Sequence, residues 1–173
     1  MCMLDIKNYI REVPNWPKEG INFKDITPLL QDGKVFKNTI DQLAELYQEE
    51  KIDLVAGIDA RGFILASALA YKLGIGLTII RKKNKLPPPT VTQDYALEYG
   101  INTIEIREDS IKPRQKVLLV DDVLATGGTM RAACGLIKKL GGEVVGISFL
   151  IILDFLKGEE KLKDYKVKGL IHY

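Results

Sequence analysis

The sequence predicts an α/β fold in which a parallel sheet forms the core and helices flank it. Two observations carry this prediction. Short, unbroken apolar runs end at turns that contain glycine or charged residues, which is typical of strands buried on both faces of a parallel sheet. Between these runs, apolar residues recur at helical spacing. The chain has 173 residues, of which 46% are hydrophobic, and we expect one domain over 1–173.

The N-terminal segment differs from the rest of the chain. Its apolar residues favour a short amphipathic helix over 4–13. Prolines and Gly20 then predict an irregular arm without a core element. On the residues alone, the simplest interpretation is an arm that wraps the core, with the Phe23 side chain plugged into it.

The central part of the chain alternates between predicted helices and strands. Helical spacing predicts helices over 36–47 and 64–73, and apolar runs predict strands over 54–58 and 77–80. This alternation is typical of βαβ units.

The predicted strand 54–58 opens into a turn that contains Asp59, Ala60 and Arg61 and leads into a helix. An arginine beside a glycine at the beginning of a helix suits an anion. An ion pair between Arg61 and Asp59 at the surface explains the same residues equally well.

A basic run with Arg81, Lys82 and Lys85 follows the predicted strand 77–80. Its ordinary interpretation is a solvated edge of the sheet. Its place directly after a strand nevertheless points it toward the end of the sheet where α/β proteins bind ligands.

The next stretch, 87–100, is polar and has no helical or sustained strand periodicity. A loop of that length in a compact domain is usually a lid or disordered. Apolar residues over 101–106 predict a returning strand, and with the turn at Lys112 and Pro113 they predict a hairpin.

A strand-to-helix turn within 117–129 is the most informative stretch. Four apolar residues predict a buried strand and helical spacing resumes at Ala133, so the turn lies over 125–129. Backbone N–H groups at the beginning of a helix bind phosphate, and Gly127 and Gly128 let the backbone approach one. Neither a Gly-Lys-Ser/Thr ending nor a G-x-G-x-x-G motif occurs in this turn, which favours a monophosphate.

Asp121 and Asp122 directly follow the four apolar residues, where we expect the strand to end. Because adjacent strand residues point to opposite faces, the two carboxylates reach one ligand only if the backbone already turns there. They would then bind a vicinal diol or Mg²⁺. Beside a phosphate site this suits a ribose 5-phosphate, although an ordinary turn explains either feature alone.

The C-terminal part contains an apolar run over 144–153 that predicts another buried strand, with Leu153 in the core. A short charged helix and a final strand follow. We identify no chemistry in this part and expect His172 to be structural.

The charge balance is even, with 25 basic and 23 acidic residues and a net charge of +2. We therefore expect neither nucleic acid nor a membrane as a partner. Cys2, Cys134 and a single histidine form neither a disulfide framework nor a His-rich metal site, which favours a reducing compartment. The N-terminus has no apolar signal core, so we expect a cytoplasmic protein.

The run from Val117 to Thr129, which reads VLLVDDVLATGGT, resembles the phosphoribosyl pyrophosphate loop of the type I phosphoribosyltransferase family. The resemblance covers essentially the whole chain. It implies the type I phosphoribosyltransferase fold, with about 1–33 as a hood over a base and about 82–100 as a flexible catalytic loop. A lid fits because transfer to a reactive sugar cation requires the exclusion of water.

The resemblance also implies the site residues. Ribose and its 5-phosphate would be bound by Asp121, Asp122, Ala125, Thr126, Gly127, Gly128 and Thr129. Pyrophosphate would be bound by Asp59, Ala60, Arg61, Arg81, Lys82 and Lys85, some of them from the neighbouring subunit of a homodimer. Adenine would be bound by Asn22, Phe23, Lys24 and Leu153, although arginine is commoner at the position of Lys24. Glu98 would be the catalytic acid or base, and the bond between Asp59 and Ala60 is a candidate cis peptide.

Within the family, the residue sequences of these motifs resemble those of the members that act on adenine. This implies a purine salvage transferase that moves phosphoribosyl from 5-phosphoribosyl 1-pyrophosphate to N9 of adenine and yields AMP and pyrophosphate. Mg²⁺ would be the cofactor, held by the substrate and by Asp121 or Asp122. Two alternatives stay open: a phosphoribosyltransferase for another base, and a regulator that senses phosphoribosyl pyrophosphate without catalysis. The regulator lacks support, because no DNA-binding extension precedes the domain and the loop keeps its acid.

Overall fold

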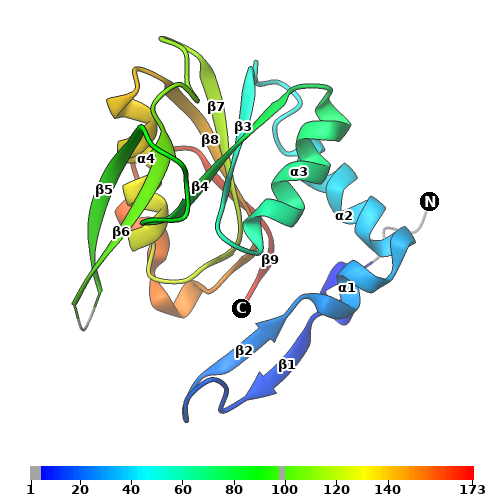
Figure 1. Ribbon diagram of the computed structural model, residues 1–173. Coiled ribbons are helices and arrows are strands. Elements are labelled where there is room, and N and C mark those ends of the chain that lie inside the picture. The colour runs from blue at the N-terminus through cyan, green and yellow to red at the C-terminus, as the bar shows by residue number, and fades with distance from the viewer. Residues whose placement is uncertain (1–4, 98–99) are drawn as a thin grey trace. The chain divides into compact units, whose positions relative to one another are not determined.

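The computed structural model describes residues 5–97 and 100–173 (Figure 1). The chain forms two compact units, 1–42 and 43–173. In the first unit, the elements are η1 (Ile6–Tyr9), β1 (Arg11–Pro14), β2 (Asn22–Asp25), α1 (Thr27–Gln31) and most of α2 (Gly33–Glu45). In the second unit, they are β3 (Leu54–Ile58), α3 (Gly62–Leu73), β4 (Gly76–Lys82), β5 (Thr90–Leu97), β6 (Gly100–Arg107), β7 (Lys116–Leu124), α4 (Gly128–Lys139), β8 (Glu143–Ile152), η2 (Asp154–Leu156), η3 (Gly158–Leu162) and β9 (Val167–His172).

The first unit contains the segment that we expect to form the hood, but its elements differ from the prediction. The amphipathic helix predicted over 4–13 is wrong: after the short 3₁₀ helix η1 the chain becomes strand β1. The reason is tertiary pairing, because β1 and β2 form an antiparallel ladder in which Val13 lies opposite Phe23. The arm is therefore a two-stranded sheet followed by a helical turn, and Ile26 is fully buried.

The second unit is built on a seven-stranded sheet with the order β5-β6-β4-β3-β7-β8-β9. Neighbouring strands from β4 through β3, β7 and β8 to β9 are parallel, whereas β6 pairs antiparallel with both β4 and β5. The mostly parallel sheet with flanking helices confirms the predicted α/β class. No helix of the described ranges is long and apolar enough to cross a membrane.

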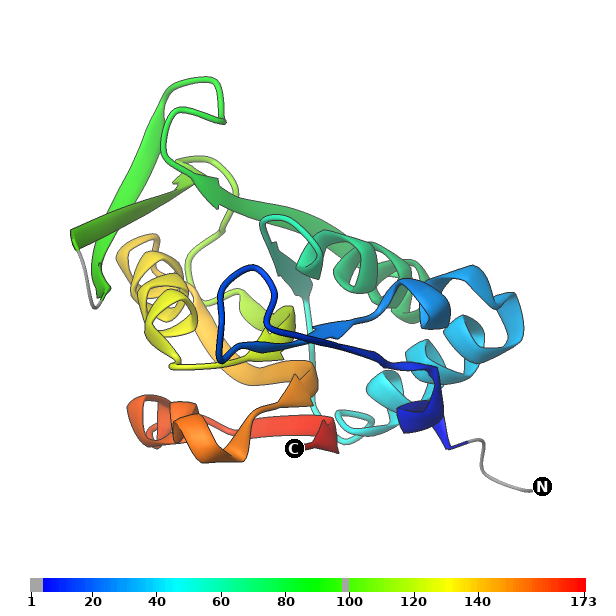
Figure 2. The same cartoon turned by 90° about the horizontal axis from the view of Figure 1, so that it is seen from below.

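Helices α3 and α4 cover opposite faces of this sheet (Figures 1 and 2). On β3, Ala56 and Ile58 belong to the same buried cluster as Met130 of α4. Gly57 alternates to the other face, where an added Cβ would lie 2.7 Å from Ala66 Cβ in α3. The parallel strands β3 and β7 are thus covered on both sides, which explains their uninterrupted apolar runs.

Strand β5 overturns the prediction that 87–100 lacks strand structure, whereas the returning strand predicted over 101–106 is confirmed as β6. The two strands pair continuously from Thr90 opposite Arg107 to Leu97 opposite Gly100. The periodicity was hidden because polar Gln93 shares the half-buried face of β5 with Val91 and Tyr95. Ladder hydrogen bonds and packing against α4 therefore decide this strand.

Strand β7 continues beyond its four apolar residues to Leu124, which lies opposite Ile152 of β8. Asp121 is still within the ladder, opposite Phe149. Asp121 and Asp122 therefore lie near the end of β7, and the turn begins at Ala125, as predicted. Backbone pairing with β8 continues regardless of the polarity of these side chains.

Candidate active site

The turn between β7 and α4 forms a pocket at the beginning of the helix. The pocket is lined by Asp121, Val123, Leu124, Ala125, Thr126, Gly127, Gly128, Thr129, Met130 and Phe149. Gly127 adopts a left-handed φ of 76° and Gly128 begins the helix, so backbone N–H groups without helical partners lie beside the pocket. Of the residues that the family resemblance assigned to ribose and its 5-phosphate, all except Asp122 line this pocket. A small anion such as phosphate suits this pocket.

A distant glycine shapes the same turn. A Cβ on Gly158 would collide with the carbonyl oxygen of Ala125, and a Cβ on Gly127 would collide with the carbonyl oxygen of Gly158. The turn can therefore hold its form only because neither glycine carries a side chain. Sequence reasoning missed Gly158, since its role depends on packing between segments far apart in the chain.

Asp121 and Asp122 lie close to each other and to the beginning of α3. Asp121 lines the phosphate pocket, and its Oδ1 accepts a hydrogen bond of 2.9 Å from the backbone N–H of Asp122. Asp122 is 7% exposed, and its Oδ2 lies 2.7 Å from Nη2 of Arg61 at the beginning of α3. Both residues belong to β7, and both carboxylates lie beside the beginning of α3, since an added Cβ on Gly62 would lie 2.6 Å from Asp121 Oδ1.

The surroundings of Asp121 disfavour its ionised form. Burial raises the pKa of the Asp121 carboxyl well above its usual range, and the nearby Asp122 charge raises it further. A cation or a hydroxyl donor near Asp121 would favour its ionised form. Asp121 is therefore suited to a ligand that brings positive charge or hydroxyl groups.

The turn after β3 lies beside these carboxylates. The peptide bond between Asp59 and Ala60 is cis, as predicted. Asp59 Oδ2 accepts a hydrogen bond of 3.0 Å from Nε of Arg81, so Asp59 pairs with Arg81 and Arg61 pairs with Asp122. The alternative of a surface ion pair between Asp59 and Arg61 is therefore not the arrangement found.

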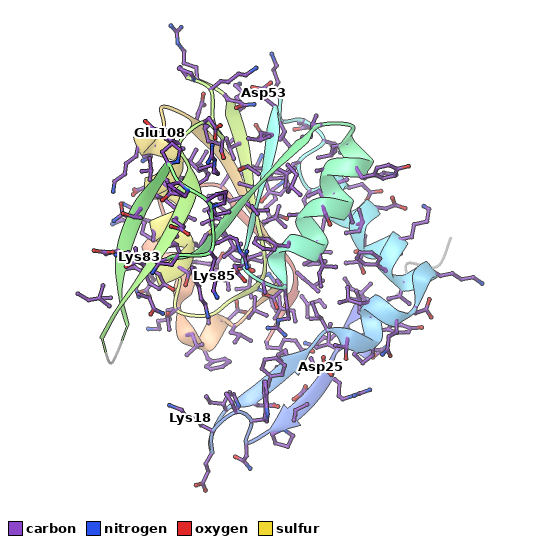
Figure 3. All side chains as sticks on the ribbon, viewed as in Figure 1. Lys18, Asp25, Asp53, Lys83, Lys85 and Glu108 are labelled. Atoms are coloured by element: carbon purple, nitrogen blue, oxygen red, sulfur yellow. The ribbon has the colours of Figure 1, made fainter. Side chains whose placement is uncertain are left out.

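The predicted basic run is divided between strand and loop: Arg81 and Lys82 are the last residues of β4, whereas Lys83 and Lys85 lie on the loop that connects it to β5. Figure 3 shows Lys83 and Lys85 on this loop, away from Asp53 at the beginning of β3. Lys82 and Lys85 are exposed, and Arg81 is half-buried over the ring of Phe63 at 6.0 Å. These cations are available to an anion at this end of the sheet.

The hood residues assigned to adenine form a cluster within the first unit. The ring of Phe23 meets the ring of Trp16 edge to face at 4.5 Å, and both rings line an apolar pocket with Val13. Asn22 Nδ2 donates to Glu12 Oε2 at 2.6 Å, and buried Lys24 pairs with the same carboxylate at 3.0 Å.

Three further residues complete the comparison with the sequence. Leu153 follows β8, is half-buried, and donates its backbone N–H to the carbonyl of Leu124 beside the phosphate turn. His172 Nδ1 lies 2.9 Å from Asp154 Oδ1. Glu98 lies outside the described residues, between β5 and β6.

Residues 26–171 match the model of the phosphoribosyl transferase domain family. The chain belongs to the phosphoribosyltransferase family. The adenine phosphoribosyltransferase of Clostridium botulinum (strain Hall) is 51% identical over 170 residues, 98% of this chain and 99% of that protein. That of Thermotoga maritima is 52% identical over 173 residues and covers 100% of both chains.

Solved structures of adenine phosphoribosyltransferases are also similar to this phosphoribosyltransferase. The crystal structure of adenine phosphoribosyltransferase from Thermoanaerobacter pseudethanolicus has a TM-score of 0.96 at 47% identity and covers 99% of both chains. The enzyme from Saccharomyces cerevisiae, complexed with an imino-altritol bisphosphate and adenine, has a TM-score of 0.91 at 36% identity and covers 96% of this chain and 97% of that one. The predicted type I phosphoribosyltransferase fold is confirmed.

Proposed function

We propose that this chain transfers the phosphoribosyl group of 5-phosphoribosyl 1-pyrophosphate to N9 of adenine and releases AMP and pyrophosphate. One observation carries the proposal: over essentially its full length, the chain is 51% and 52% identical to two relatives named adenine phosphoribosyltransferase. The phosphate pocket bounded by Asp121 supports it from the geometry. Such an enzyme serves purine salvage.

In the reaction, the bond from C1 of the ribose to the pyrophosphate oxygen breaks and the bond from C1 to N9 forms. Backbone N–H groups at the beginning of α4 hold the 5-phosphate, and Asp121 and Asp122 orient the ribose hydroxyls. Arg61, Arg81 and the exposed lysines of the β4–β5 loop stabilise the leaving pyrophosphate. Glu98 accepts the proton that leaves N9 of adenine.

We propose Mg²⁺ as the metal that enters with the pyrophosphate substrate. Among the residues at 5–97 and 100–173, no three His, Cys, Asp or Glu side chains cluster as metal ligands. Mg²⁺ at phosphate sites is commonly held by one or two carboxylates together with phosphate oxygens, and Asp121 fits that donor set. When bound, the ion neutralises negative charge on the pyrophosphate.

We also propose a homodimer in the cytoplasm. Ile64 and Tyr71, seven residues apart on α3, are 40% and 91% exposed, and Leu77 at the beginning of β4 is 40% exposed. Exposed apolar side chains that together form a contiguous patch mark protein interfaces, and we propose that these three belong to one. The free, buried thiol of Cys134 suits a reducing compartment. Sedimentation analysis should give a dimer, and Tyr71→Asp should shift it toward monomer.

A substrate panel tests the activity. Purified protein with Mg²⁺ and 5-phosphoribosyl 1-pyrophosphate should consume adenine far faster than hypoxanthine, guanine or orotate. The double variant Asp121→Asn/Asp122→Asn, prepared in parallel, should lose most of the turnover, which excludes a contaminating host enzyme. Turnover of another base in preference to adenine, or of none, would overturn the proposal.

A further inference from the structure

Side chains of neighbouring strands hold the loop between β4 and β5, residues 83–89, through hydrogen bonds to its backbone groups. Glu105 of β6 accepts hydrogen bonds at Oε1 from the N–H groups of Lys85 at 2.8 Å and Leu86 at 2.9 Å. Its Oε2 lies 3.3 Å from the hydroxyl of Thr90, which donates to it. One carboxylate therefore satisfies several donors around the bend of this loop.

Two arginines hold the carbonyl groups of the same loop. Nη1 of Arg107 donates to the carbonyls of Pro87 at 3.0 Å and Pro88 at 2.7 Å, and Nη1 of Arg81 donates to that of Lys85 at 3.2 Å. Glu105 and Arg107 are two residues apart on β6, so they share a face of the sheet. The carboxylate thus holds the N–H groups of the loop and the guanidinium groups hold its carbonyls.

Glu105 is only 3% exposed, and burial of an ionised carboxylate costs free energy unless hydrogen bonds compensate for the lost hydration. Burial alone would raise its pKa, but the backbone N–H groups of Leu86 and Lys85 hold the pKa below its usual range. The carboxylate is therefore kept ionised beneath a loop that carries exposed Lys83 and Lys85 (Figure 3).

The same contacts reach the turn after β3. Arg81 lies opposite Glu105 in the β4–β6 ladder and donates both to the carbonyl of Lys85 and, through Nε, to Asp59 at 3.0 Å. The basic loop and the turn that contains Asp59 are thus joined through one guanidinium group.

We propose that Glu105 is a positioning residue for pyrophosphate, a role that rests on the proposed function. It fixes the backbone of 84–86 so that Lys85 and Lys83 meet the pyrophosphate from an ordered loop. Pyrophosphate itself contacts the lysines, and Glu105 acts through the peptide groups between them.

Glu105→Gln tests the role, because the amide keeps the shape but loses the charge and one acceptor oxygen. We expect the KM for 5-phosphoribosyl 1-pyrophosphate to rise on the order of tenfold, as for loss of a hydrogen bond to a charged group. In the reverse reaction, the KM for pyrophosphate should rise similarly, whereas the KM values for adenine and AMP stay within about twofold. Glu108→Gln, an exposed carboxylate three residues along, should leave all four KM values unchanged.

Thr90→Val gives a second test that is independent of the charge. It removes the hydroxyl contact to Oε2 and should raise the same two KM values by a smaller factor, even if Glu105→Gln does not fold. A folded Glu105→Gln protein with wild-type KM for pyrophosphate, or with equal rises for adenine and pyrophosphate, would overturn the role. If the wild type turns over no adenine, the proposed function fails instead, and calorimetric titration of pyrophosphate into wild type and variant still decides the role of Glu105.

Discussion

Arg61 and Asp122 form an ion pair of 2.7 Å between the beginning of α3 and the end of β7. The pair joins the turn assigned to pyrophosphate with the strand assigned to ribose, although 60 residues separate the two in the sequence. Asp121, next in the chain, remains directed at the phosphate pocket. Both carboxylates therefore lie beside the beginning of α3, and the first two predictions concern them.

Replacing both carboxylates should weaken binding of the sugar substrate. Asp121→Asn/Asp122→Asn removes charged acceptors for the ribose hydroxyls, and such hydrogen bonds are worth about 1.5–3 kcal/mol each. The dissociation constant of 5-phosphoribosyl 1-pyrophosphate, measured by calorimetry, should rise at least about tenfold, and that of adenine should not change. Glu159→Gln, an exposed carboxylate on η3, is the matched control. Unchanged sugar binding in a folded double variant would refute these roles.

The raised pKa of Asp121 predicts a pH-dependent gain in stability for Asp121→Asn. Since burial disfavours the ionised form, the folded protein holds this proton more tightly than the unfolded chain. Wild type therefore loses stability as the pH rises above about 4, the ordinary pKa of aspartate, whereas Asn has no proton to lose. The Tm of the variant minus that of wild type should increase from about pH 4 to pH 8. A difference that stays flat or decreases contradicts the assignment.

Gly158→Ala should damage the phosphate turn from outside it. The new Cβ would collide with the carbonyl oxygen of Ala125, and overpacking of this kind costs about 1–3 kcal/mol. The KM for 5-phosphoribosyl 1-pyrophosphate should rise while the KM for adenine stays constant. Gly33→Ala, where an added Cβ meets nothing within 4 Å, is the control. Wild-type kinetics in Gly158→Ala would show that the turn tolerates the side chain.

Phe23→Ala should raise the KM for adenine. An aromatic ring stacked on a base contributes about 1–3 kcal/mol, and the half-buried Phe23 ring lines a pocket in the hood. Steady-state kinetics and thermal melting should be recorded together, with Ile21→Ala on the same arm as the control. A lowered Tm with an unchanged KM would instead support the interpretation of Phe23 as a core residue.

Glu98→Gln should slow the chemical step. General acid–base catalysis contributes about 10²- to 10⁴-fold in rate, and the amide keeps the size of the side chain but cannot exchange the proton. Single-turnover measurements should show a decrease of that order, with nearly unchanged dissociation constants for both substrates. Glu108→Gln is the control, and a wild-type single-turnover rate in Glu98→Gln would remove Glu98 from the mechanism.

The sequence by itself determined the α/β class, strand 54–58 and the helices that follow, because buried strands and amphipathic helices leave periodic patterns in neighbouring residues. It also located the glycine-containing turn between β7 and α4, to which we assign the phosphate, since glycines at a strand-to-helix junction act through their own backbone. The resemblance to a known family added the expected substrates. The match to the phosphoribosyl transferase domain and the similar proteins confirm the family.

The tertiary structure decided the features that depend on partners far along the chain. Strand β5 exists because β6 pairs with it, and β7 extends through Asp121 because β8 continues beside it. Two further features could not be predicted from neighbouring residues: the ion pair of Arg61 with Asp122, and the burial of Glu105 under the β4–β5 loop. The sequence around a charged residue does not indicate whether its side chain is solvated or paired. Only the fold brings their partners within hydrogen-bonding distance.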